Sequence, residues 1–217
     1  MKRRKQLPTR RRRALRWMAA LALLVLACHL LGAYCLTPER VLRKLEQSRH
    51  TGATEFLWRD DHPDGMEKGS LRLAGGDHAA ILCLYRFYWS GGWRAGAIDY
   101  AERRADQPFS AAHYQGWGKY DRDWEKRIDY HYVFGAVEDP GIAELIIHFD
   151  AIEGGHDQTV RLTAADWICN DAGDRFFLCA LEPQVGNYSR ACSVVGVYED
   201  GSMTKRLQLM GSEPRWE

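Results

Sequence analysis

The chain of 217 residues is long enough to form one domain that buries its own core, even after a targeting segment is set aside. Its formal charge of +1 hides an asymmetry, because nine basic residues precede the first acidic residue, Glu39. The rest of the chain has 21 basic residues against 29 acidic ones, a net charge of −8, which argues against nucleic acid or anionic lipid as a partner of the folded domain.

The N-terminus predicts a membrane anchor. Residues 1–16 form a basic tail, and residues 17–36 after it carry no formal charge over a length that spans a bilayer core. The Lys and Arg residues before this segment predict that the tail stays in the cytoplasm. We therefore expect a single-pass protein of the cell membrane, with residues 17–36 as signal anchor and the C-terminal domain extracytoplasmic.

Two alternatives to an uncleaved anchor stay open. A cleaved signal peptide usually has a shorter apolar stretch that ends at a small-residue cleavage site, and no such site is evident here. Cys28 follows Val25, Leu26 and Ala27, a pattern similar to a lipidation site, although the apolar run continues to Leu36. The basic tail could also be read as a nucleic-acid patch, but directly before an apolar segment its ordinary role is to orient the span.

Residues 37–51 predict a short juxtamembrane helix. Thr37 is a typical N-cap, Pro38 suits the first helical position, and Glu39 adds an acidic residue to the first turn. Glu39 and Arg43 have the spacing of an i,i+4 ion pair. We expect this helix to be a stalk between the membrane and the domain.

Residues 52–217 predict an extracytoplasmic β domain. Short apolar or alternating runs are separated by turn residues such as Gly-Gly and Asp-Pro-Gly, which predicts strands near 54–59, 70–74, 79–89, 93–100, 128–137, 142–149, 159–163, 175–181, 192–198 and 203–209. The run at 81–89 is almost wholly apolar, and its strand is expected to be central. Residues 101–126 lack the pattern and are predicted to be a long connection. Many short strands without a long helix favour a mainly β fold, an antiparallel β-sandwich of immunoglobulin-like or related type.

Several of these segments together carry a resemblance. The apolar span, the Thr-Pro-Glu helix start, His-Thr-Gly-Ala-Thr-Glu at 50–55 and Val-Phe-Gly-Ala-Val-Glu-Asp-Pro at 133–140 resemble small, uncharacterised single-pass proteins of Gram-positive bacteria. The resemblance implies an anchored β domain outside the cytoplasm. It implies no catalytic residues.

The cysteines of the predicted domain allow several pairings. Cys83, Cys169, Cys179 and Cys192 would meet an oxidising exterior, and Cys169 and Cys179 flank a turn across which they could pair. Each also stands in an apolar run, where a free cysteine packs as a small hydrophobic residue. Their disulfide state stays open, and zinc binding is not expected because closely spaced ligand pairs are missing.

One grouping could support a metal or hydrolytic site. His148 and Asp150 lie on the same side of a predicted strand, and the Gly-Gly turn that follows could bring His156 back toward them. A solvated strand end is the simpler interpretation, and His131 is likewise expected to be an outward-facing strand residue. No nucleophile motif is present, so no catalytic residue and no cofactor are predicted.

Aromatic residues supply the candidate binding face. Trp89 and Trp93 flank a Ser-Gly-Gly turn, and Trp117 and Trp124 stand in the predicted long connection. Exposed indoles could stack on a sugar ring or bind a protein, whereas buried ones would only fill the core.

The function expected from the sequence is therefore a non-enzymatic, membrane-anchored binding module, such as an envelope accessory or sensor protein. Its partner would be an envelope protein or a wall glycan. The alternative is a surface hydrolase or metal-binding protein that uses His148, Asp150 and His156.

Overall fold

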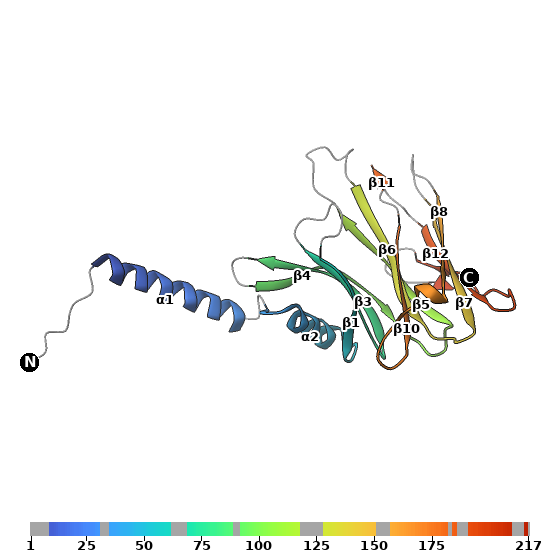
Figure 1. The fold of residues 1–217 in the computed structure, drawn as a ribbon, viewed down its shortest axis with the longest axis horizontal. Coiled ribbons are helices and arrows are strands. Elements are labelled where there is room, and N and C mark those ends of the chain that lie inside the picture. The colour runs from blue at the N-terminus through green and yellow to red at the C-terminus, as the bar shows by residue number, and fades with distance from the viewer. Residues whose placement is uncertain are drawn as a thin grey trace, which may run out of the picture.

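The fold of this chain was analysed in a computed structural model, which describes residues 9–30, 35–61, 69–88, 92–117, 128–150, 157–181, 184–185, 191–209 and 215–216. These residues form two α-helices and three antiparallel sheets, so the predicted mainly β, antiparallel class is confirmed. Figure 1 shows the helices on one side and the sheets following one another toward the C-terminus.

The first sheet has the order β1-β2-β3-β4, built from β1 (Thr54–Asp60), β2 (Ser70–Gly76), β3 (Ala79–Tyr88) and β4 (Gly92–Glu102). The middle sheet has β6 (Ile128–Val137) between β5 (Phe109–Trp117) and β10 (Arg175–Ala180), with β9 (Ile168–Cys169) and β11 (Gln184–Val185) at its margins. The third sheet has the order β14-β13-β12-β7-β8, built from β14 (Arg215–Trp216), β13 (Leu207–Gln208), β12 (Ala191–Tyr198), β7 (Ile142–Asp150) and β8 (Gln158–Thr163).

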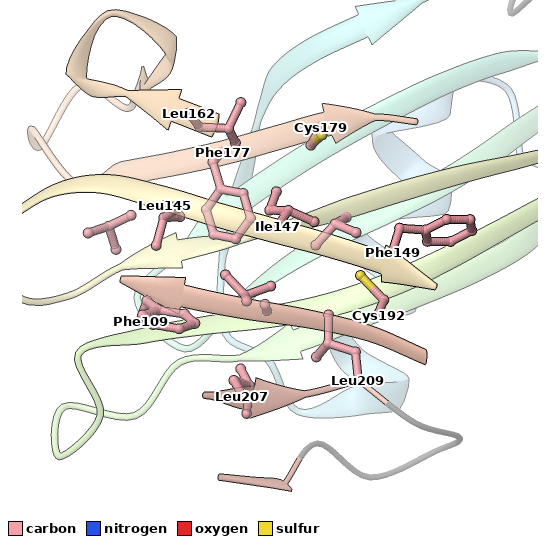
Figure 2. Packing of buried hydrophobic residues seen from close by; sticks show 14 of the residues in the cluster. Phe109, Leu145, Ile147, Phe149, Leu162, Phe177, Cys179, Cys192, Leu207 and Leu209 are labelled. Carbon is pink, nitrogen blue, oxygen red and sulfur yellow. The ribbon is translucent and has the colours of Figure 1, made fainter. Parts of the chain in front are cut away.

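Strand β6 is buried on both faces and so connects two hydrophobic cores. Tyr132 and Phe134 pack with Leu73 and Leu82 of the first sheet, in a core shared by the first and middle sheets. Val133 on the opposite face belongs to the core shared by the middle and third sheets. Figure 2 shows this second core, in which side chains of the third sheet face those of β5 and β10; it labels Phe109, Leu145, Ile147, Phe149, Leu162, Phe177, Cys179, Cys192, Leu207 and Leu209.

Helix α2 (Pro38–Arg49) forms where the sequence predicts it, but it is no free stalk. The Thr37 side chain accepts a hydrogen bond from the Arg40 N–H, and Val41 and Leu42 pack on the outer face of the first sheet. The sequence did not predict this contact, because the apolar residues of a helix show which face is buried but not which element packs against that face.

A buried carboxylate fixes α2 to β1. Glu46 accepts hydrogen bonds from the backbone N–H and the hydroxyl of Thr54 at 2.6 and 2.7 Å, and Arg43 donates to it at 2.9 Å. Although burial raises the carboxyl pKa, these hydrogen bonds outweigh burial and leave it below its usual value. The predicted Glu39–Arg43 pair is wrong, because Arg43 pairs with Glu46 and Glu39 lies 3.7 Å from Arg72.

Strand β5 is the main departure from the predicted strand order, because residues 109–117 were expected to belong to a long connection. Its small residues hide the alternation that marks a strand, yet it pairs with β6 along its whole length. The two strands approach closely at Gly135, where an added Cβ would lie 1.8 Å from the Ser110 carbonyl oxygen. The rest of the predicted connection, residues 118–126, lies outside the described residues.

Helix α1 (Thr9–Leu30) begins within the basic tail and extends away from the sheets in Figure 1. Among the described residues, no helix combines the length and the apolar character needed to cross a membrane. At the end of the predicted span, Cys35 is buried and forms a β-bridge with Trp93, so this residue belongs to the first sheet. Residues 31–34 of the predicted span lie outside the described residues.

Arg103 ties the first sheet to the middle sheet. Its guanidinium makes a two-pronged contact with Glu138 at 2.7 and 2.9 Å, donates to the Gly76 carbonyl at 2.9 Å, and lies 3.2 Å from an Asp174 oxygen. The Arg103 side chain is only 10% exposed. These contacts raise the Arg103 pKa above its already high value, chiefly through the hydrogen bond with Glu138.

Replacing Arg103 with alanine is expected to lower the free energy of unfolding by about 3 kcal/mol, because two carboxylates lose a largely buried partner. Chemical denaturation of the full chain would measure this change. Arg104→Ala is the matched control, since Arg104 pairs with Glu102 on an exposed surface and its loss should have no measurable effect. Equal effects of the two substitutions would contradict the structural role given to Arg103.

Candidate functional site

A hollow of about 650 Å³ opens where the middle and third sheets end. Its walls come from segments far apart in the sequence: the loop between β4 and β5, the turn between β6 and β7, the end of β12, the residues before β13, and β14. The lining residues are Ala105, Asp106, Gln107, Pro108, Glu138, Asp139, Pro140, Tyr198, Thr204, Lys205 and Trp216.

The floor of the hollow is held by a hydrogen-bond network. The Tyr198 hydroxyl donates to Asp139 at 3.1 Å, and the backbone N–H groups of Glu138 and Asp139 both donate to the Pro108 carbonyl. Thr204 accepts from the Gly196 N–H and donates to the Lys205 carbonyl. Hydrogen bonds to neighbouring segments therefore fix the positions of Tyr198, Asp139 and Thr204.

The chemistry of the hollow combines aromatic surface with both signs of charge. Trp216 packs on Phe109 with ring centroids 4.9 Å apart and presents the rest of its half-buried ring to the hollow. Desolvation and the hydrogen bond with Asp139 raise the pKa of Tyr198, so its phenol stays protonated and can donate. Carboxylates, a phenol, an ammonium group and an indole suit recognition of a polar ligand that also has an apolar face.

Comparisons of the chain with family models, with curated proteins and with solved structures found no match. The resemblance to small anchored proteins of Gram-positive bacteria therefore stays a prediction.

Of the four tryptophans of the predicted binding face, the structure describes the side chain of Trp93 alone. Trp93 is half-buried and contacts Phe87 edge to face, with ring centroids 5.6 Å apart. Trp117 ends β5 in a different sheet, and nothing is described of its side chain. Trp89 and Trp124 lie outside the described residues.

The predicted metal or hydrolytic grouping is described only in part. His148 Nδ1 lies 3.1 Å from the Thr159 hydroxyl on the neighbouring strand β8, and Asp150 is exposed at the end of β7. His156 lies outside the described residues. Within the described ranges, no group of three or more His, Cys, Asp or Glu side chains could hold a metal ion.

A pair of histidines occupies the core between the middle and third sheets. His113 Nε2 and His131 Nδ1 are 3.0 Å apart, so the N–H of one ring donates a hydrogen bond to the ring nitrogen of the other, and Phe149 packs against both rings. The expectation that His131 faces outward was wrong, because its side chain is 2% exposed. The pair was not predicted from the sequence, because His113, the partner of His131, lies on the unpredicted strand β5.

Five cysteines are free thiols among the residues whose side chains are described: Cys35, Cys83, Cys169, Cys179 and Cys192. Cys169 is exposed whereas Cys179 is buried, so the local pair that the turn between them allows is not formed. Burial raises the pKa of Cys192 to about 12, which favours the role of a packed apolar side chain.

The hollow itself was missed at the sequence level. Tyr198, Lys205 and Trp216 belong to no spacing pattern, because three different strands or loops bring them together. The turn signal Asp139-Pro140-Gly141 predicted one of the segments that line the hollow, but it carried no information about which segments would lie opposite.

The histidine pair predicts a pH dependence of stability. Burial, and for His113 also the neighbouring His131, lower the pKa of each histidine to about 4, against about 6.5 in an unfolded chain. Below pH 6.5 the unfolded chain takes up protons that the folded chain does not. The free energy of unfolding should therefore fall as pH falls from about 6.5 to 4, by at most about 3 kcal/mol per histidine.

Asp99 works in the opposite direction, because burial raises its pKa to about 6 and acid then favours the folded chain. The test is therefore the difference between the wild-type chain and a His113→Leu/His131→Leu double variant, in which Asp99 is common to both. Chemical denaturation at pH 7.5, 6.5, 5.5 and 4.5 should give a less pH-dependent stability for the variant. Parallel curves would show that the histidines titrate normally in the folded chain.

Proposed function

We propose that this protein is a non-enzymatic, membrane-anchored binding module, with its N-terminal tail in the cytoplasm and its β domain on the outer side. The hollow between the middle and third sheets would bind a wall glycan. We further propose that the packed antiparallel sheets are an elaborated β-sandwich. The single observation that carries the anchoring is the exposure of the apolar side chains of α1.

The apolar half of α1 presents its large side chains outward. Residues 17–30 carry no formal charge, and within them Trp17, Met18, Leu21, Leu23, Leu24, Leu26 and Leu30 are each more than half exposed. Transfer of this apolar surface from water into a bilayer is favourable by roughly 25 cal/mol for each Å² that is buried. The four arginines Arg10–Arg13 in the same helix precede it, in the order expected of a cytoplasmic flank.

The hollow supports binding because its position and chemistry suit an external ligand. The third sheet and the C-terminus lie at the end of the molecule opposite α1 (Figure 1). Sugar polymers offer hydroxyl groups to carboxylates and apolar ring faces to aromatic side chains, both of which line the hollow.

The anchoring predicts that the full chain resists extraction from membranes by alkaline carbonate. Leu23→Arg/Leu24→Arg should abolish this resistance, because each charge near the centre of an inserted helix costs about 3 kcal/mol. The control is Leu23→Ala/Leu24→Ala, which shortens the same two side chains without adding charge. Release of the wild-type chain by carbonate would contradict the proposal.

The glycan proposal predicts that soluble wall glycan fragments raise the thermal midpoint of the full chain in lipid nanodiscs, since they bind only the folded state. Lys205→Ala removes a charged donor from the hollow and should weaken binding about tenfold, the usual effect of losing a hydrogen bond from a charged group. Arg161→Ala, on the exposed face of β8, should leave the affinity unchanged. A flat response to all fragments would reject the glycan and favour a protein partner.

A further inference from the structure

The end of the β3–β4 hairpin, defined here as residues 86–88 and 92–94, takes no part in the hollow. The last pair between β2 and β3 is Ser70↔Tyr85, and beyond it β3 pairs with β4. The cross-strand pairs of the hairpin end are Arg86↔Arg94, Phe87↔Trp93 and Tyr88↔Gly92. In Figure 1 it projects past the rest of the first sheet, toward the C-terminal end of α1.

The hairpin end exposes aromatic surface. Phe87 is 49% exposed and Tyr88 is 39% exposed, although other side chains of β3 are among the most buried of the chain. Leu36, next to the residue that bridges to Trp93, is 58% exposed. Large exposed aromatic side chains beside aliphatic ones are typical of the zone where a bilayer meets water.

A backbone bridge holds the hairpin end close to α1. The Cys35 N–H donates to the Trp93 carbonyl at 2.8 Å, and the Trp93 N–H donates to the Cys35 carbonyl at 2.7 Å. Cys35 follows the last described residue of α1, Leu30, by five residues, a stretch of at most roughly 18 Å of chain. If α1 enters a membrane, the hairpin end cannot leave the neighbourhood of the headgroups.

The charge of the hairpin end fits an anionic surface, although the domain as a whole is acidic. Its six residues include Arg86 and Arg94 and no acidic residue. Exposed charges more than about 8 Å away are largely screened at physiological salt, so Arg86 and Arg94 dominate the interaction of the hairpin end with a charged surface. The expectation that the acidic domain avoids anionic lipid considered the net charge alone and not its distribution.

We propose that the end of the β3–β4 hairpin lies in the headgroup region of the membrane and holds the domain against anionic phospholipid. Phe87, Tyr88 and Trp93 supply the interfacial surface, the exposed Arg94 binds the phosphates, and the half-buried Arg86 adds positive charge beside it. This inference rests on the proposed anchoring through α1, and it adds a second contact that fixes the orientation of the domain.

The test uses the full chain in nanodiscs of phosphatidylcholine alone or with phosphatidylglycerol, and hydroxyl-radical labelling read by mass spectrometry. Labelling of Phe87 and Tyr88 should fall in anionic nanodiscs relative to neutral ones, while Tyr198 in the hollow is labelled equally in both. Arg94→Gln should lower the ratio of docked to free hairpin about fivefold, because one cation near an anionic surface contributes about 1 kcal/mol. Arg86→Gln/Arg94→Gln should lower it further.

The matched control is Arg161→Gln/Arg206→Gln, which removes two exposed arginines from the third-sheet side of the domain and should leave the labelling of the hairpin end unchanged. Protection of Leu21 and Leu24 in the same samples reports the anchoring separately. If α1 is protected while Phe87 and Tyr88 are labelled equally in both nanodiscs, the docking is wrong and the anchoring stands. If α1 is labelled as in solution, the anchoring itself fails.

Discussion

The fold depends on one constraint, which is that strand β6 has no face open to water over its described side chains, Tyr130 to Val137. Every residue from Tyr130 to Val137 is buried, with alternate side chains in the core toward the first sheet and in the core toward the third. A strand buried in this way has no solvent to satisfy its polar side chains. This is why His131 needs His113 as a hydrogen-bond partner, and why Gly135 lets β5 approach closely enough to cover that side of the strand.

Burial on both faces does not by itself determine the positions of the layers relative to one another. A few polar contacts between elements determine these positions. Arg103 joins the end of β4 to Glu138 at the end of β6 and to Asp174 before β10. Glu46 does the same between α2 and β1. Because the carboxylates in both contacts are shielded and have several donors, removing one partner leaves an uncompensated charge, which makes the arrangement specific.

Features determined by residues close together in the sequence were predicted correctly, whereas features that depend on distant segments were not. Thr37 and Pro38 define the start of α2 within a few residues, and the Asp139-Pro140-Gly141 turn defines the β6–β7 connection, so both were predicted correctly. Strand β5 was not predicted, because its small residues pack against both neighbouring layers and its sequence therefore lacks the alternation of apolar and polar residues that marks a strand. The hollow and the histidine pair could not be predicted, because they arise from pairing between strands whose order in the sheets has no local signature.

The two ends of the molecule carry different kinds of surface, because the first sheet lies at one end and the third sheet at the other (Figure 1). The first sheet carries α2, the Cys35–Trp93 bridge and the aromatic hairpin end, all close to α1. The third sheet carries Tyr198, Lys205 and Trp216 of the hollow. Since β6 packs rigidly against both sheets, a hairpin held in the headgroup region would set the distance and direction of the hollow from the membrane. In the proposed anchoring, the two backbone hydrogen bonds between Cys35 and Trp93 would therefore hold the domain in one orientation relative to the membrane.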